Sequence, residues 1–345
     1  MAASLSDFSA RQPFFVVGCP RSGTTLLQTI LDSHPDVAVP PESHFFRHYR
    51  GAVEAETPET SPWEDSRLID DLLENFRIKS WRSELKRTDL LPNAKNTSSV
   101  FERIFCQYAR SHKKSVWGDK TPQHAFDLDI ILSVFPKARI IYMVRDGRDV
   151  AESYLRAFIG PAHIATCAER WKTYVDTVQK MRTRIGSEQF LRIRYEDLVL
   201  EPEVTQRKLW QFLGLSDPGA IEPSKSTAAE IYLRLSYLHK TSQESLSANR
   251  IGRFKDNLSH AQILQFEQIA GKQLIQESYQ VFRSNVVDLA GGHTRASVPI
   301  KVFDAISRLV RKILFPDGRR QLKDDWMELR QRIRRKRILR KILQR

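Results

Sequence analysis

The fold is decided by one stretch near the N-terminus, which reads Phe14-Phe15-Val16-Val17-Gly18-Cys19-Pro20-Arg21-Ser22-Gly23-Thr24-Thr25. Its apolar, β-branched first half predicts a buried strand over 14–18. A glycine-bounded loop follows, and the apolar residues of 26–31 predict the first turns of a helix. Strand, glycine-rich loop and helix in this order are typical of a phosphate-binding loop.

The loop departs from the Walker A pattern at one position. Gly18 and Gly23 have the Walker A spacing, but Thr24 stands where that pattern has lysine. The missing lysine is the group that reaches the β- and γ-phosphates of a nucleoside triphosphate. With Arg21 as its cation, the loop is predicted to hold a single 5′-phosphate group and whatever is attached to it. A plain tight turn capped by Ser22 and Thr24 is the alternative.

Composition narrows the class of protein. With 345 residues, 41% of them hydrophobic, the chain can form one large domain or one domain with an appendage. The three cysteines lie at wide spacings, which predicts neither a disulfide framework nor a zinc site and favours a reducing compartment. The chain shows no signal peptide and no apolar run of about 18 residues. We therefore expect a cytoplasmic protein, with a peripheral position at the inner membrane face as an alternative.

The positive charge is concentrated at the C-terminal end. The whole chain carries a formal net charge of +14, and residues 301–345 contain 16 Lys and Arg against 5 Asp and Glu. Apolar residues recur there at helical spacing, which predicts a basic amphipathic helical tail over 300–345. Residues 284–299, with two adjacent glycines and a proline, are predicted as a linker between this tail and a P-loop domain over 1–283.

Two interpretations of the tail stay open. Its helices could pack on the domain with a solvated basic face, or they could dock on an anionic membrane surface or an acidic acceptor. Nucleic acid is disfavoured as a partner, because the basic run lacks interleaved aromatic residues and a recognisable binding module. No motif indicates an oligomeric state.

Strands and helices alternate along the first 283 residues. The apolar runs predict strands at 14–18, 37–39, 115–118, 138–144 and 190–195. The longer periodic segments predict helices at 66–78, 99–111, 148–156, 162–183, 202–213 and 260–281. The alternation predicts an α/β, P-loop-containing three-layer fold, with a mainly parallel central sheet flanked by helices.

A second phosphate site is predicted after the strand over 138–144. Arg145 follows that strand, at the sheet edge where ligands bind in open α/β folds. Ser153 lies eight residues later, in the next helix, so that the two side chains can bracket a phosphate. A turn followed by a capped helix is the alternative. Lys120 is expected in a turn after the strand over 115–118.

Glu42 follows the short strand over 37–39 and lies on a loop at the sheet edge where ligands bind in open α/β folds. The alternative role for Glu42 is to cap the helix that follows.

The string Pro20-Arg21-Ser22-Gly23-Thr24-Thr25-Leu26 resembles the 5′-phosphosulfate loop of sulfotransferases that use 3′-phosphoadenosine 5′-phosphosulfate (PAPS). The motif pattern is most similar to the tyrosylprotein sulfotransferase-like branch and its bacterial relatives. The resemblance implies that Arg21, Ser22, Gly23, Thr24 and Thr25 hold the 5′ end of PAPS.

The resemblance also implies roles for residues outside the loop. Arg145 and Ser153 map onto the 3′-phosphate site, and Lys120 onto the lysine that offsets charge on the sulfuryl group. Glu42 maps onto the general base of the tyrosylprotein branch, which takes the proton of the acceptor hydroxyl. Because other members of the family use a histidine, His44, His48 and His124 are alternative bases. Tyr195 maps onto the residue at the adenine end. Arg253 lies in a late basic loop that closes over the nucleotide.

Two departures from the tyrosylprotein branch put a tyrosine substrate in doubt. Ala157 stands where that branch has a second arginine for the 3′-phosphate. Ala248 stands where it has a serine, a contact that Ser247 could replace. Both departures bear on the acceptor more than on the chemistry.

The resemblance implies in-line sulfuryl transfer from PAPS to a hydroxyl of a glycan, lipid, small molecule or protein tyrosine, with no metal. The first alternative is a P-loop kinase or nucleotidase that uses ATP and magnesium, which Thr24 argues against. The second is a non-catalytic nucleotide-binding protein that its tail holds on a membrane. Acceptor determinants are expected within 43–110 and 220–250, where no motif identifies the acceptor.

Overall fold

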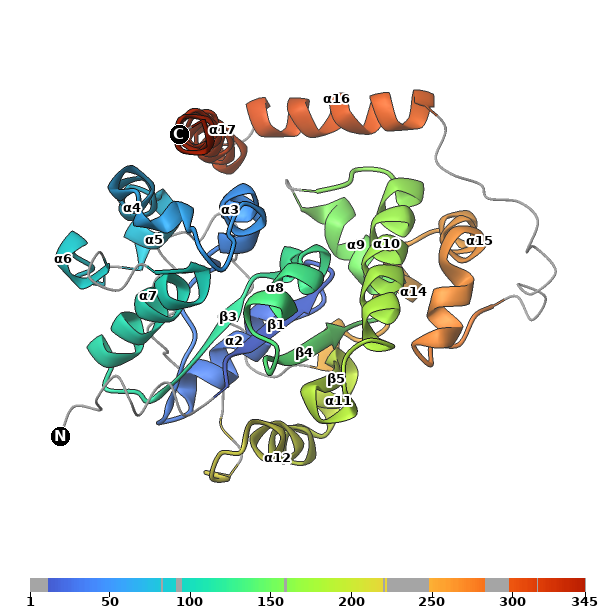
Figure 1. Cartoon of the computed structure of the whole chain (residues 1–345). Helices are drawn as coiled ribbons and strands as arrows, with labels where there is room; N and C mark the ends of the chain where they lie inside the picture. The colour runs from blue at the N-terminus through green and yellow to red at the C-terminus, as the bar shows by residue number, and fades with distance from the viewer. Residues whose placement is uncertain are drawn as a thin grey trace.

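The computed structural model describes residues 12–81, 83–90, 95–157, 160–219, 221, 248–282, 298–314 and 316–344. At its centre lies a five-stranded parallel sheet with the strand order β2-β3-β1-β4-β5 (Figure 1). The strands are β1 (Phe14–Gly18), β2 (Val37–Ala38), β3 (Val116–Lys120), β4 (Arg139–Val144) and β5 (Phe190–Arg194). The α/β fold predicted from the sequence is therefore confirmed.

Helices cover both faces of the sheet. Their bounds are α2 (Thr24–Ser33), α3 (Phe45–Glu54), α4 (Ser66–Leu73), α5 (Phe76–Ser80), α6 (Arg87–Leu90), α7 (Thr97–Ser111), α8 (Leu128–Val134), α9 (Gly147–Arg156), α10 (Ile164–Arg182), α11 (Tyr195–Leu200), α12 (Pro202–Leu213), α14 (Phe254–Asn257), α15 (His260–Gln276), α16 (Val298–Leu314) and α17 (Pro316–Leu343).

The central strand β1 is buried on both faces, because successive side chains of a strand point to opposite sides. Phe15 and Val17 belong to the larger core, which α3, α7, α8, α9, α10 and α15 complete. Phe14 and Val16 belong to the smaller core, which α2, α11 and α12 complete. These two cores separate the sheet from its helices and produce three layers.

Three predicted boundaries are wrong for local reasons. The helix expected over 66–78 is two helices, because Asn75 caps a new helix by accepting a hydrogen bond from the Arg77 N–H. The helix expected over 260–281 ends at Gln276, and Ser278 just beyond it has a left-handed φ of 66°. Lys120 is the last residue of β3 rather than part of a turn.

The C-terminal segment forms two helices that lie along one side of the molecule (Figure 1). On α17, Leu339 and Ile342 pack against the larger core. Helix α16 begins at Val298, inside the range expected for the linker, and residues 283–297 lie outside the described part of the chain. Among the residues that the structure describes, no helix is long and apolar enough to cross a membrane.

Candidate active site

The loop between β1 and α2 can close only with glycine at two positions. A Cβ atom on Gly18 would lie 2.2 Å from the carbonyl oxygen of Met143 on the neighbouring strand. Gly23 has a φ of 94°, and a Cβ atom there would lie 2.5 Å from the ring of Tyr195. Between them, Arg21 adopts a left-handed φ of 77°. These contacts bring the loop against the ends of β4 and β5.

The first turn of α2 has the properties of an anion site. Gly23 is the N-cap residue, and no side chain caps the helix. The alternative of a turn capped by Ser22 and Thr24 is therefore wrong. The N–H groups and dipole of an uncapped helix start favour a bound anion. Ser22 Oγ is buried beside this turn and has no hydrogen-bond partner.

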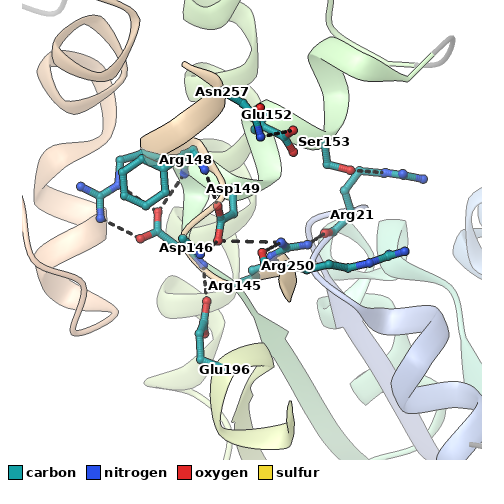
Figure 2. A network of polar contacts seen from close by, with 12 residues as sticks. Arg21, Arg145, Asp146, Arg148, Asp149, Glu152, Ser153, Glu196, Arg250 and Asn257 are labelled. Atoms are coloured by element: carbon teal, nitrogen blue, oxygen red, sulfur yellow. Dashed lines mark hydrogen bonds and ion pairs between the residues drawn. The ribbon is translucent and has the colours of Figure 1, made fainter. Parts of the chain in front are cut away.

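The two predicted phosphate sites meet at the carboxyl edge of the sheet (Figure 2). Arg21 Nε donates a hydrogen bond to Ser153 Oγ at 3.0 Å. Arg145 is buried, donates from Nη1 to the carbonyl oxygen of Arg21 at 3.5 Å, and stacks 4.4 Å above the ring of Tyr195. Its Nε has no hydrogen-bond partner. Four residues predicted from separate segments are thus linked in one chain of contacts, from Ser153 through Arg21 and Arg145 to Tyr195.

Asp149 fixes a late loop beside Arg145. Its carboxylate accepts hydrogen bonds from the backbone N–H groups of Gly252 at 2.8 Å and Phe254 at 2.9 Å. The same loop supplies the carbonyl oxygen of Arg250, which accepts a hydrogen bond from Arg145 Nη2. Figure 2 shows the Arg250 side chain lying beside Arg145 and Arg21. Arg250 therefore joins the site.

Of the two arginines in this late loop, the sequence predicted Arg253 as a residue of the nucleotide site and did not predict Arg250. Arg253 is the N-cap residue of α14, and within the described chain its side chain forms no hydrogen bond or ion pair with the other predicted site residues. The basic string over 250–255 contained both arginines. Only the fold shows which of them lies beside Arg145.

The site is strongly electropositive. Burial lowers the pKa of Arg21, and the nearby cations Arg145 and Arg250 lower it further. Arg148, in contrast, is a structural residue, because its guanidinium forms ion pairs with Asp146 and Glu267, each at 2.7 Å. Asp149 forms an ion pair with Arg145 at 3.8 Å, and clustered arginines of this kind are typical of a site for phosphate groups.

Glu42 and Lys120 face each other at the ends of neighbouring strands. Lys120 Nζ is buried and donates a hydrogen bond to Glu42 Oε1 at 2.7 Å, and His44 Nε2 lies 3.0 Å from Glu42 Oε2. Burial alone would raise the pKa of Glu42, but Lys120 and His44 together hold it well below its usual range. Glu42 is therefore ionised at neutral pH.

The three candidate histidine bases differ in their surroundings. Burial lowers the pKa of His44 despite its contact with Glu42, and burial lowers the pKa of His48 to about 4. His124 is fully buried, and burial holds its pKa well below its usual value. All three are neutral at pH 7, and of the three His44 makes the hydrogen bond to Glu42.

A cavity of about 440 Å³ lies next to His44. It is bordered by elements from four distant parts of the chain, including the C-terminal helix α17. Its lining residues are His44, Arg47, Arg77, Gln123, Phe126, Arg170, Thr173, Tyr174 and Glu328. Sequence reasoning missed this cavity, because no local motif joins these positions.

The geometry agrees with a comparison against known families. The family model described as "Sulfotransferase family" matches residues 13–219, the segment that contains both predicted phosphate sites, Glu42 and Lys120. The chain belongs to the sulfotransferase family.

Two curated relatives illustrate the range of this sulfotransferase's similarities. A protein-tyrosine sulfotransferase of Drosophila melanogaster is 26% identical over 211 residues, which is 58% of this chain and 37% of the relative. An omega-hydroxy-beta-dihydromenaquinone-9 sulfotransferase of Mycobacterium bovis is 34% identical over 131 residues, 34% of this chain and 33% of the relative. The sulfotransferase spans about half or less of the length of the first curated relatives that it matches.

Solved structures agree on the fold. The sulfotransferase domain from the Synechococcus PCC 7002 olefin synthase superposes with a TM-score of 0.55 at 19% identity, covering 79% of this chain and 97% of that domain. The resemblance to tyrosylprotein and bacterial sulfotransferases predicted from the sequence is confirmed.

Proposed function

We propose that this sulfotransferase moves a sulfuryl group from PAPS to a hydroxyl acceptor. The observation that carries the proposal is that three features lie at the same edge of the sheet. They are the uncapped start of α2, the Arg21–Arg145–Ser153 cluster and the Glu42–Lys120 pair. Two anion sites beside a carboxylate are what a doubly phosphorylated sulfuryl donor and a hydroxyl acceptor require.

The residues fit PAPS. Ser22 Oγ and Arg145 Nε are buried donors without a partner, and such groups are costly unless a ligand satisfies them. The loop over 21–25 would hold the 5′ end, and Arg145 with Ser153 would hold the 3′-phosphate. Tyr195, which stacks on Arg145, would border the adenine end, and the late loop with Arg250 and Arg253 would cover the nucleotide.

Glu42 serves as the general base in this proposal. When bound, PAPS supplies the sulfuryl group that the acceptor oxygen attacks. Glu42 takes the proton of the acceptor hydroxyl, and Arg21 and Lys120 stabilise negative charge around the transferred group. A carboxylate held at a very low pKa is a weak base, so Lys120 must turn from Glu42 toward the sulfuryl oxygens as the acceptor reacts. His44 keeps Glu42 oriented.

The cavity beside His44 is the proposed acceptor site. Its wall combines arginines with the aromatic rings of Phe126 and Tyr174. The curated relatives are named for a tyrosine and for a long-chain lipid hydroxyl, and either acceptor presents an apolar group next to its hydroxyl. The proposal therefore covers an acceptor whose hydroxyl is carried by an aromatic or lipidic group.

Thermal unfolding with nucleotides tests the proposal. Adenosine 3′,5′-bisphosphate at about 100 times its dissociation constant adds about 2.7 kcal/mol to the free energy of unfolding. We expect this stabilisation without magnesium, little from AMP, and the same shift in Glu42→Gln. Glu42→Gln should lower turnover of PAPS by about 10²- to 10⁴-fold. Stabilisation by ATP with magnesium alone would replace the sulfotransferase proposal with a kinase.

A further inference from the structure

Helix α16 is docked with a polar residue inward and its apolar side chains outward. Asp304 is buried, and its carboxylate accepts hydrogen bonds from the Ala162 N–H at 2.5 Å and from Thr166 Oγ at 2.9 Å. Val302, Ile306 and Leu309 are each more than half exposed. At about 100° per residue, these three lie roughly 140–200° around the helix from Asp304. The apolar stripe therefore points away from the body of the protein.

Helix α17 repeats this arrangement. Arg335 is buried, with Nε 2.8 Å from Asp71 Oδ2 and Nη1 donating to the carbonyl oxygen of His48 at 3.0 Å. Trp326, Leu329 and Ile333 are large, exposed side chains roughly 120–180° around the helix from Arg335.

Arginines share the outward face of α17 with these apolar residues. Arg330, Arg337 and Arg340 are exposed and lie roughly 140–220° from Arg335. Figure 1 shows α16 and α17 along the same side of the molecule. Their outward faces form one surface, here called the tail surface, that is apolar on α16 and apolar with arginines on α17.

The composition of the tail surface identifies the kind of partner it fits. A soluble helix normally buries its apolar stripe, so a stripe directed outward on two adjacent helices marks a binding surface. The segment 301–345 holds 16 Lys and Arg against 5 Asp and Glu, and this charge repels a second copy of the same surface. Nucleic acid would satisfy the arginines and leave the apolar stripes exposed.

We propose that the tail surface docks on a lipid bilayer that carries anionic headgroups. The stripes of α16 and α17 enter the boundary between headgroups and acyl chains, and the arginines bind lipid phosphates. Glu328, on the inward side of α17, lines the cavity beside His44, so α17 would lie between that cavity and the docked bilayer. This inference concerns binding alone and does not depend on the proposed transfer reaction.

Vesicle co-sedimentation of the full chain tests the proposal. The probes are vesicles of phosphatidylglycerol with phosphatidylcholine, and vesicles of phosphatidylcholine alone. We expect binding to the anionic vesicles, with an affinity that falls as salt is raised. Ile306→Asp combined with Ile333→Asp should weaken binding by at least about tenfold, because two apolar anchors are lost and two negative charges are added.

Leu200→Asp is the matched control, because Leu200 is equally exposed but lies on α11. It should bind vesicles like the parent chain, and all variants should unfold at the parent's temperature. Absence of binding to anionic vesicles, or equal binding by the double variant, overturns the proposal. So does a parent chain that forms dimers or binds RNA through the tail surface while ignoring vesicles.

Discussion

Arg145 and Arg148 stand three residues apart, yet their guanidinium groups have different partners. Arg145 contacts backbone carbonyl oxygens and the Tyr195 ring, with one carboxylate, Asp149, at 3.8 Å, and its Nε has no hydrogen-bond partner. Arg148 lies between Asp146 and Glu267 in a buried triad. Arg145 therefore has a hydrogen-bond donor left for a ligand, whereas the ion pairs of Arg148 hold the start of α9 against α15.

This difference predicts opposite effects of the same substitution. Arg145→Ala should lower the affinity for adenosine 3′,5′-bisphosphate far more than that for AMP, with stability preserved. Arg148→Ala leaves buried carboxylates unpaired and should cost about 3–5 kcal/mol of unfolding free energy. Urea unfolding with and without each nucleotide measures both effects. A large loss of stability in Arg145→Ala would contradict the assignment.

Lys120→Met should move the acid limb of the pH–rate profile. Lys120 lowers the pKa of Glu42, so the parent carboxylate stays ionised far below neutral pH. Without this cation, burial raises the pKa, and activity should be lost at a higher pH as the solution is acidified. The exposed Lys137→Met is the control, since Lys137 precedes β4 at the opposite edge of the sheet. Identical acid limbs in all three proteins would refute the coupling.

At the scale of elements, α17 depends on one buried ion pair. Asp71 on α4 is buried and is reached by Arg335 at 2.8 Å, with the exposed Arg334 at 3.7 Å. Arg335→Ala should cost about 3 kcal/mol, because the remaining cation is too solvated to replace the lost partner. Trypsin should then cleave within α17 first. Arg330→Ala, at an exposed position over Trp326, should behave like the parent chain.

The sequence predicted those elements whose signal is local. Each predicted phosphate site lies within its own strand–loop–helix stretch, β1 to α2 for one and β4 to α9 for the other, so the residues and spacing of each could be recognised from the local sequence. Helix α3 was expected only as the helix that Glu42 would cap in the alternative role, and that cap is wrong, because His44 is the N-cap residue and no side chain caps the helix. Phe45, Tyr49 and Ala52 recur at helical spacing and are buried. The residue before this helix, His44, has a left-handed φ of 51°, and residue propensities do not predict that conformation for a histidine.

The cavity beside His44, the proposed acceptor site, could not be predicted for a different reason. Its lining comes from α3, α5, α10, α17 and the turn after β3. Glu328, which lines the cavity, is 280 residues from His48 in the sequence, yet Glu328 Oε1 lies 3.2 Å from His48 Nε2. No spacing rule connects such positions, because only the packing of α17 on α3 and α4 brings them together. The sequence around Glu42 likewise gave no sign of its contact with His44.

At the scale of the whole molecule, the proposed nucleotide site and the proposed acceptor cavity are formed by different parts of the chain. A chain that ends at residue 297 loses α16 and α17, and with them the Glu328 wall and the partner of Asp71. We expect this chain to keep its stabilisation by adenosine 3′,5′-bisphosphate and to lose acceptor turnover. Thermal unfolding measures the stabilisation by the nucleotide, and radiolabelled sulfuryl transfer measures the turnover. Unchanged turnover would show that α17 is not part of the acceptor site.

The hydrogen bonds between Asp149 and the late loop have a consequence for the sequence variation that this loop tolerates. Asp149 holds this loop through the main-chain N–H groups of Gly252 and Phe254, which every residue except proline possesses. Substitutions can therefore change the side chains of the loop, and with them its contacts to a ligand, while the loop backbone stays in place. In a saturation mutagenesis experiment, Asp149 should tolerate few replacements, whereas positions 251 and 255 should tolerate many. The loop would then be the part of the site most open to adaptation.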